Sequence, residues 1–453
     1  MNRTKQNSRI LLVSCFIFSV ILFLIHFLFF RHTFPETNID EASFFSPAYS
    51  FAEKGTLSSD LHSQFLPGAS KYTYWMPPLY MFSLGLIFKV LGSSIFVAKF
   101  MSFLYAFAAA IVLTFLSKNQ HTKIWIFALF LICPFVILSS SFIRMETLGL
   151  LIVSASILSV KNEVKTGYLG GLAALAVMTH PLLGACAAAL AFVAARRGLR
   201  QFVFFTLAFL VIVSPYLFYI SLDFELFKEQ MSLQLLRKSK KEFSSISISY
   251  ILQSLPIALI ALYLLWKIKK YADLKYFLLI GITLSLILIL KSGEFNYHIY
   301  LIPYAIAIIA LYRDENLSSL FGRLWIPVSF YCFFCLLLFA KMYADKITPD
   351  ASYKELLETL KQNPQWNGKE IYVYGMPDVS IFLIEKGQNV KRQNAVASKR
   401  KKGWESKYNF VIQIIDHLHP RKISGTYPWF SWKNISSYKT SDGHYTLITY
   451  AKE

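Results

Sequence analysis

Long apolar runs recur along most of this chain and favour a membrane-embedded helical protein. Of its 453 residues, 55% are hydrophobic and only 16% are charged, whereas an average soluble domain has about 25% charged residues. The first run, residues 10–30, is long enough to cross a bilayer, which takes about 20 apolar residues. No small-residue cleavage site follows it, so we expect an uncleaved anchor.

Further runs predict a polytopic protein with about 11–13 transmembrane helices. Residues 168–195 contain His180-Pro181 and form either one kinked span or two short ones, because proline interrupts a helix. With the basic N-terminus in the cytoplasm, an odd total puts the C-terminus outside and the basic loops 196–200 and 267–270 inside. The candidate spans are residues 10–30, 77–91, 96–117, 124–142, 147–160, 168–195, 201–221, 247–266, 276–290, 297–312 and 324–343.

The net charge of +20 would indicate a nucleic-acid partner in a soluble protein. Here the basic residues gather in short loops between apolar runs, which is typical of cytoplasmic loops and of contact with anionic lipid. We therefore expect a lipid bilayer as a partner and no nucleic acid. The five cysteines all lie in apolar runs, where a packing role is favoured over redox chemistry.

The chain changes character near residue 345. We expect a transmembrane domain over 1–344, with a first outer loop over 31–76, and a small extracytoplasmic α/β domain over 345–453. Within the latter, the sequence from Lys369 to Gly387 predicts strand, turn and helix, and two further strands are expected at 409–415 and 445–450. Residues 222–246 are polar and amphipathic, which suits a helix on the membrane surface.

An acidic pair, Asp40-Glu41, follows the first span closely. Asn38 and Glu41 have capping-box spacing, and the helix they open is expected to end at Gly55, with Pro47 as a kink or break. Its aromatic residues suggest that it lies at the membrane interface. The acids either stabilise the helix N-terminus or act as a general base at the membrane surface.

The first loop ends in an aromatic stretch from Lys71 to Tyr80, with Pro77-Pro78 opening the next span. Interfacial aromatics and an N-terminal proline account for this stretch structurally. Taken together, Asp-Glu-Ala after span one, an aromatic helix ending in glycine, and Pro-Pro-Leu-Tyr opening span two resemble one family. It is the GT-C fold family of lipid-carrier-dependent glycosyltransferases, which includes protein O-mannosyltransferases and the lipid A aminoarabinose transferase. Similar stretches occur at 88–99, 142–146 and 175–181, and the resemblance covers roughly residues 10–345.

The resemblance implies a glycosyltransferase that moves a hexose or pentose from a polyprenyl-phosphate donor (undecaprenyl or dolichyl phosphate) to an acceptor on the outer face, with inversion. It implies Asp40 as the catalytic base, with Glu41 beside it. Many family members carry a lysine directly before the Pro-Pro pair, where this chain has Met76; the nearest lysine is Lys71. Cations near the phosphate would stabilise the departing charge. The implied substrate-binding residues are Lys71, Tyr74, Pro77, Tyr80, Arg144, Glu146, His180, Lys291, Tyr297 and His298.

Several of these residues have a structural alternative. Arg144 and Glu146 flank a span and either bind substrate or pair only with each other, and an eleven-span count puts their loop inside. His180 is either a ligand-binding or a core histidine. Lys291, Tyr297 and His298 form either a phosphate-binding loop or an ordinary polar turn.

The functional alternative from another class is a transporter or flippase of a lipid-linked or small polar substrate, which needs polar residues at mid-membrane. Within catalysis, a polymerase or ligase acting on lipid-linked sugars is the rival. No residues demand a cofactor, and a divalent metal held by Glu41 with His298 is an unsupported option. We expect a multi-pass protein of the plasma (inner) membrane with a cytoplasmic N-terminus and an extracytoplasmic C-terminal domain. The acceptor is a glycolipid, a polysaccharide or a protein.

Overall fold

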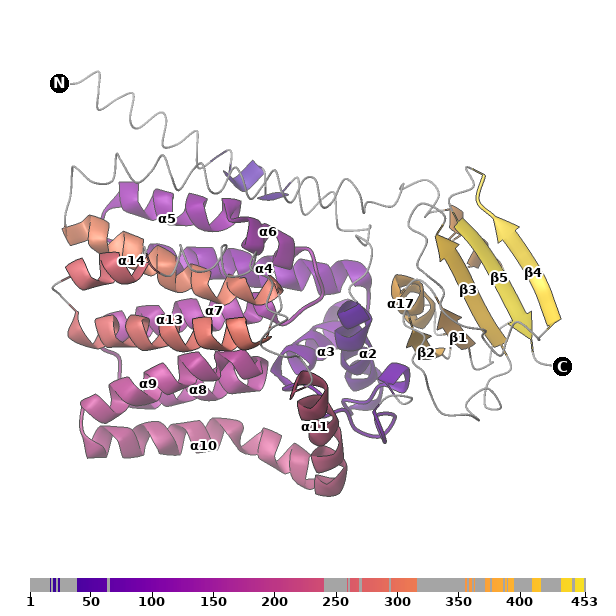
Figure 1. The fold of residues 1–453 in the computed structure, drawn as a ribbon, viewed down its shortest axis with the longest axis horizontal. Helices are drawn as coiled ribbons and strands as arrows, with labels where there is room; N and C mark the ends of the chain where they lie inside the picture. Colours follow the sequence, from indigo (N-terminus) through magenta and orange to yellow (C-terminus); the bar gives the residue numbers. More distant parts are fainter. Residues whose placement is uncertain are drawn as a thin grey trace, which may run out of the picture. The chain divides into compact units, whose positions relative to one another are not determined.

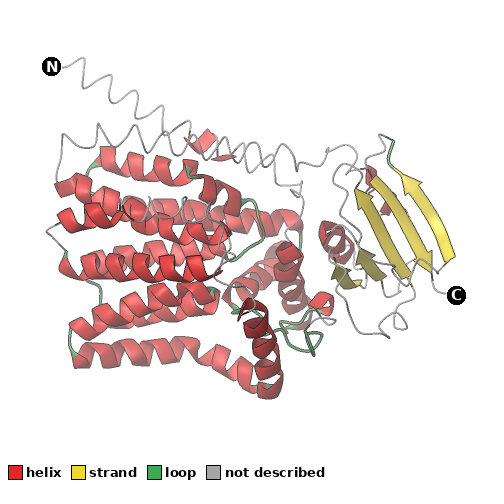
Figure 2. Ribbon diagram, viewed as in Figure 1, coloured by secondary structure: helices red, strands yellow, loops and turns green. Residues whose placement is uncertain are grey.

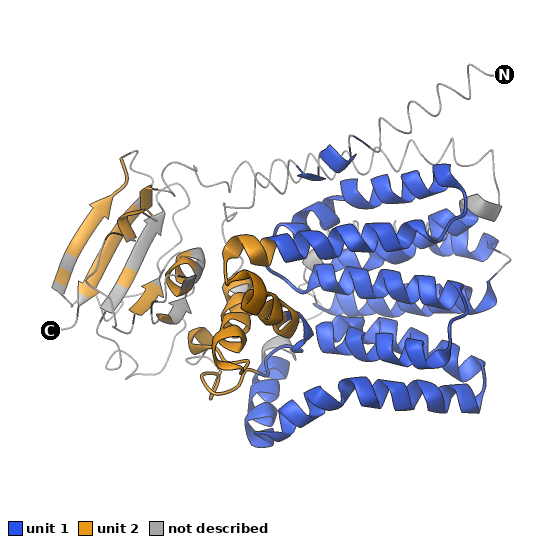
Figure 3. Ribbon diagram, turned by 180° about the vertical axis from the view of Figure 1, so that it is seen from behind, with its two compact units in different colours: residues 1–28, 74–80, 100–339 blue, residues 29–73, 81–99, 340–453 orange. Residues whose placement is uncertain are grey.

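The computed structural model groups the chain into two compact units (Figure 3). Unit 1 comprises residues 1–28, 74–80 and 100–339, and unit 2 comprises 29–73, 81–99 and 340–453. The residues that the structure describes are 17, 19–21, 23–24, 39–62, 66–239, 259, 261–268, 271–292, 295–315, 355–356, 358–360, 362, 371–374, 377–385, 388, 390–394, 410–416, 433–441 and 445–451. The expected spans 10–30, 247–266 and 324–343, and the expected cap Asn38, lie largely or wholly outside these residues.

Unit 1 is a bundle of helices that lie side by side (Figures 1 and 2). In chain order its elements are α4 (Ile95–Thr114), α5 (Gln120–Ile132), α6 (Pro134–Ser140), α7 (Glu146–Lys161), α8 (Thr166–Thr179), η2 (Pro181–Leu183), α9 (Gly184–Arg196), α10 (Leu199–Ser221), α11 (Phe224–Ser239), α13 (Ala272–Ser292), η4 (Phe295–Leu301) and α14 (Ile302–Glu315). The first turn of α4 belongs to unit 2.

Small residues let the central helices approach closely. The sequences of α8 and α9 consist mainly of Gly, Ala and Thr with scattered large apolar residues, a composition that favours helix contact in membranes. At Gly170, a Cβ atom would lie only 2.1 Å from the carbonyl oxygen of Phe205 on α10. The packing of α8 on α10 therefore depends on this glycine.

Two sets of contacts define the ends of the bundle. At one end, the Lys161 ammonium donates to the carbonyl oxygen of Leu116, just after α4. At the same end, Arg197 donates to the carbonyl oxygen of Val164 at 2.9 Å and pairs with Asp273 at 2.8 Å. We call it the Lys161 end. The opposite end, where α7 begins, α8 and α13 finish and η4 lies, is the Arg144 end.

The stretch 168–195 forms two helices, α8 and α9, that separate at His180-Pro181. The stretch 124–142 is likewise interrupted, because α5 and α6 are bent by 61° at Cys133. With α8 and α9 counted as two crossings of the bundle, the loop 143–146 comes to the same end as η4, which contacts α6, α7 and α13. Counting 168–195 as a single span, which would put this loop and 291–298 at opposite ends, is therefore wrong.

Three described helices are long and apolar enough to cross a membrane: α4, α10 and α13. The bent pair α5 and α6 meets the same criteria when taken as one broken span. Most side chains of α10 face outward, and Val211 and Phe218 are among its exposed residues, as expected of a helix bordered by lipid. The total of 11–13 spans remains a prediction.

In unit 2, the helix α2 (Ile39–Lys54) runs through Pro47 without a break. It ends at Gly55, whose φ of +73° is the left-handed conformation of a glycine cap. Of the aromatic residues expected to face a membrane interface, Phe44 and Phe45 are instead buried inside unit 2. Phe45 packs on Phe88 of α3 (Leu79–Leu91) with ring centroids 5.0 Å apart.

The C-terminal part of unit 2 contains a five-stranded sheet in the order β2-β1-β3-β5-β4 (Figure 1). β1 (Ile371–Tyr374) pairs in parallel with β2 (Val390–Asn394) and β3 (Phe410–Asp416), whereas β5 (Tyr445–Ala451) is antiparallel to β3 and to β4 (Lys433–Lys439). The helix α17 (Pro377–Glu385) follows β1 and packs on α2, and β2 contacts the short helix η1 (Asp60–His62).

Candidate functional site

A buried ion pair lies at the start of α7. The guanidinium of Arg144 is 2.7 Å from Glu146 Oε1, and the two side chains are only 7% and 1% exposed. Glu146 is the first helical residue, where the helix dipole favours a carboxylate. The pairing anticipated from the sequence is therefore present. Such a pair is expensive to desolvate inside an apolar bundle, which favours a functional role over a stabilising one.

His180 lies at the Arg144 end of the bundle, at the break between α8 and η2. Its backbone is extended because proline follows it. Its Nδ1 atom accepts the backbone N–H of Leu182 at 3.1 Å, so a neutral ring carries its proton on Nε2. The ring packs against Tyr297 and Tyr300 of η4, at centroid distances of 4.8 and 5.4 Å.

Tyr300 links these groups. The Tyr300 hydroxyl has Glu146, Tyr297 and Arg144 as electrostatic neighbours. Its ring lies against Gly149 of α7, where a Cβ atom would be 2.6 Å from Tyr300 Cε1. The hydroxyl is buried and has no hydrogen-bond partner among the residues that the structure describes. A ligand at this position would find a donor already in place.

His298 completes the group, with its ring stacked on Phe135 of α6 at 5.7 Å. We name these six residues the polar end cluster: Arg144, Glu146, His180, Tyr297, His298 and Tyr300. All are buried, and all come from segments that meet at the Arg144 end. The sequence pointed to five of them. It did not point to Tyr300, although the glycine opposite it was an available signal.

The other proposed binding residues lie in different surroundings. Lys291 is exposed in the last turn of α13, at the Arg144 end. Tyr74 and Tyr80 are buried and engaged in structural contacts: Tyr74 donates its hydroxyl to the carbonyl oxygen of Tyr219 at 3.1 Å, and Tyr80 bonds Ser102 at 3.1 Å. Pro77 is half-buried, two residues before α3.

Asp40, Glu41 and Lys71 belong to unit 2. Asp40 is the second residue of α2, and the Glu41 side chain is buried. Lys71 is exposed, with its ammonium 5.2 Å from the ring centroid of Tyr72. In the same unit, burial lowers the pKa of His62 from 6.5 to about 3, so this imidazole is neutral at physiological pH.

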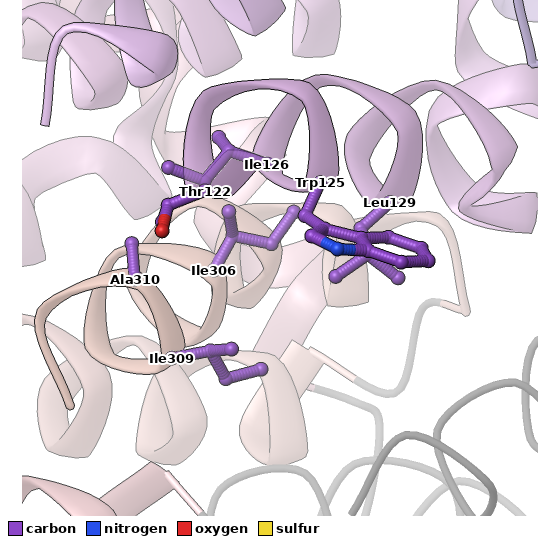
Figure 4. Close-up of a pocket in the computed structure, with 7 residues that line it drawn as sticks. All are labelled: Thr122, Trp125, Ile126, Leu129, Ile306, Ile309 and Ala310. Atoms are coloured by element: carbon purple, nitrogen blue, oxygen red, sulfur yellow. The ribbon is translucent and has the colours of Figure 1, made fainter. Parts of the chain in front are cut away.

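A small recess between α5 and α14 is apolar (Figure 4). Its volume is about 10 Å³, enough for one water molecule but not for a sugar. Its lining residues are Thr122, Trp125, Ile126, Leu129, Ile306, Ile309 and Ala310. No group of three or more His, Cys, Asp or Glu side chains arranged to hold a metal occurs in the described part of the chain.

No protein-family model matches the sequence, and no curated protein matches it significantly. Among solved structures, ArnT from Cupriavidus metallidurans bound to undecaprenyl phosphate matches with a TM-score of 0.56 and 13% identity, over 96% of this chain and 97% of that chain. ArnT in the apo state matches with a TM-score of 0.54 and 12% identity, over 95% and 97%.

The archaeal oligosaccharyltransferase AglB from Archaeoglobus fulgidus, in complex with an inhibitory peptide and a dolichol-phosphate, matches with a TM-score of 0.54 and 11% identity. The match covers 90% of this chain and 69% of that chain. Both proteins have the GT-C fold, and this chain shares it, so the fold expected from the sequence motifs is confirmed.

Proposed function

We propose that this protein is a membrane glycosyltransferase that takes a sugar from a polyprenyl-phosphate carrier. The fold likeness to ArnT bound to undecaprenyl phosphate spans nearly the whole of both chains. AglB, which matches over most of its length, was solved with a dolichol-phosphate. Two proteins of this fold thus hold a polyprenyl-phosphate lipid, and the proposal extends that ligand class to this chain.

The observation that carries the proposal is the polar end cluster. Ionisable residues are costly inside an apolar helix bundle and are usually retained there for function. Tyr300 and Tyr297 carry hydroxyl groups, His180 has an Nε2 proton, and Arg144 brings a guanidinium that is paired with Glu146. These are the donors that a lipid phosphate requires. Lys291 adds a positive charge at the same end of the bundle.

For the chemical step, we propose Asp40 as the general base, as in the family that the sequence resembles. The acceptor's hydroxyl or amine loses its proton to the Asp40 carboxylate and forms a bond to the anomeric carbon of the sugar. The bond between that carbon and the phosphate oxygen breaks, and the lipid phosphate leaves with the electron pair. Attack opposite the leaving group inverts the anomeric carbon. Phosphate is a stable anion, so the step needs little acid assistance.

The charge distribution supports an orientation. The Lys161 end carries the basic side chains Lys161, Lys165, Arg196, Arg197 and Arg200, and such clusters normally stay in the cytoplasm. The polar end cluster would then face the outer side of a plasma (inner) membrane. The donor sugar and the nature of the acceptor, whether glycolipid, polysaccharide or protein, are to be found by assay. We propose the 345–453 segment as an extracytoplasmic α/β domain.

The test compares wild type with Asp40→Asn in membranes supplied with labelled polyprenyl-phosphate sugars. We expect transfer by the wild type and a loss of about a hundredfold or more in Asp40→Asn. Glu53→Gln is the matched control, because it removes one carboxylate from the exposed end of the same helix. Melting temperature in detergent checks folding. Full activity in Asp40→Asn would refute the role of Asp40 as general base. Absence of transfer by the wild type from every donor would favour a transporter or flippase.

A further inference from the structure

Unit 2 contains a lysine whose burial the proposed reaction does not explain. Lys99 lies near the start of α4, and its exposed fraction is 0%. A fully buried ammonium is rare unless an anion compensates it. Among the acids of unit 2 whose side-chain burial the structure describes, Glu41 alone is buried to a similar degree, at 1%. A pair between these two residues requires that the fold bring them together.

The register between α2 and α3 places Glu41 near the start of α4. The two helices are antiparallel, and three contacts follow one another at intervals of three residues. Phe51 meets Phe82 at 4.8 Å, the carbonyl oxygen of Ala48 would be 2.8 Å from a Cβ at Gly85, and Phe45 meets Phe88 at 5.0 Å. Because Gly85 has no room for a side chain, the register cannot slip without a clash.

Continuing this register by one further step brings the first turn of α2 to the corner after α3. Glu41 falls opposite Gly92, whose φ of +83° ends α3. The chain then turns at once into α4, with the Ser94 hydroxyl accepting the backbone N–H of Val97 at 3.1 Å. Lys99 follows within the next turn, so a lysine side chain of about 6 Å reaches back to this corner.

We propose that Lys99 and Glu41 form a buried ion pair that fixes the first turn of α2. Both are positioning residues, because the turn they hold carries Asp40, and this catalytic consequence rests on the proposed function. Because both groups are buried away from water, each compensates the charge of the other. The pair also fixes where α2 begins, and with it the backbone position of Asp40.

The pair is tested first by a double-mutant cycle on melting temperature in detergent, with Lys99→Met, Glu41→Gln and the double variant. We expect each single change to lower the melting temperature by about 5 °C or more, and the double to lower it by clearly less than the two together. The control changes, Lys89→Met and Glu53→Gln, concern an exposed lysine of α3 and the exposed glutamate of α2. They should have small and additive effects.

Additive losses of melting temperature in the double-mutant cycle, or an unaltered melting temperature in Lys99→Met, would overturn the proposed ion pair. If Lys99→Met does not fold, the readout becomes the recovery of folded protein in the double variant, and no recovery overturns it equally. These measurements need no activity, so they are independent of the proposed function.

The positioning role is tested with a labelled polyprenyl-phosphate sugar as probe. Lys99→Arg should retain transfer, whereas the folded double variant should lose at least about tenfold in kcat with little change in KM. A double variant with wild-type kcat would show a pair without a role in positioning.

Discussion

Gly170 offers the sharpest test of the bundle's packing. Replacement by alanine would put a Cβ atom 2.1 Å from the carbonyl oxygen of Phe205 and 3.0 Å from its carbonyl carbon. Carbon and carbonyl oxygen approach to about 3.3 Å at closest. The atoms in the way belong to the α10 backbone, which cannot rotate aside, so α8 and α10 would have to separate by about 1 Å.

The expected cost follows from this separation. Overpacking of a well-packed interior costs about 1–3 kcal/mol, and the higher helix propensity of alanine offsets up to about 1 kcal/mol of that. Because the clash is with backbone atoms, the upper end of that range applies, and the net destabilisation for Gly170→Ala is about 2 kcal/mol. Gly171 is the matched control, since the nearest atom to its added Cβ, Ile212 Cγ1, is 3.9 Å away. Gly171→Ala should be neutral or stabilising by up to about 1 kcal/mol.

The assay is the melting temperature of the two purified variants in the same detergent. Gly170→Ala should melt a few degrees below the wild type, and Gly171→Ala at or above it. Equal melting temperatures for the two variants, or a loss confined to Gly171→Ala, would refute the close approach of α8 and α10.

Three further outcomes follow from the described contacts. Arg144→Met removes the cation facing the buried Glu146 and should lower the free energy of unfolding by about 3–5 kcal/mol. The added change Glu146→Gln should recover most of this loss, and equal melting temperatures for the single and double variants would contradict it. The lowered pKa of His62 means that only the unfolded state binds a proton between pH 6.5 and 3, so up to about 5 kcal/mol of stability, fully present above pH 6.5, is lost as the pH falls to 3. His62→Leu should show a weaker fall in melting temperature from pH 7.5 to 5, and an unchanged fall would refute this. Leu383 is buried on α17, which packs on α2. Leu383→Ala should therefore destabilise the protein by about 2–4 kcal/mol and reduce transfer, and a wild-type melting temperature with wild-type transfer would contradict a role of α17 in supporting α2.

The sequence predicted those helices and strands whose position depends on their own residues. The end of α2 at Gly55 follows from a glycine that adopts positive φ without strain. The strands near Ile371, Phe410 and Tyr445 and the helix at Pro377 follow from apolar alternation and turn residues. The strands β2 and β4, rich in Lys, Arg, Asn and Ser, gave no such pattern, because their pairing comes from neighbouring strands.

The placement of the Arg144 loop relative to η4 could not be read from the sequence, because it depends on how many times the chain crosses between them. One proline decides that number: the break at His180-Pro181 makes two helices of 168–195, and the loop and η4 therefore come to the same end of the bundle. The sequence also predicted that α2 lies at the membrane interface, since an aromatic residue in a sequence does not reveal whether lipid or protein covers it. Only the partner, α3, shows that Phe45 is a core residue.

The proposed function requires that the protein bind a polyprenyl phosphate at the polar end cluster. The most direct measurement is the binding of radiolabelled undecaprenyl phosphate to the purified protein, with Tyr300→Phe and Tyr304→Phe as paired variants. Each loses one buried tyrosine hydroxyl, but Tyr304 lies against Gly281 of α13 and outside the cluster.

We predict saturable binding by the wild type, a loss of about five- to tenfold in affinity for Tyr300→Phe, and an unchanged affinity for Tyr304→Phe, since one hydrogen bond contributes about 1 kcal/mol or more. Absence of saturable binding by the wild type, or equal affinities for all three proteins, would contradict the account.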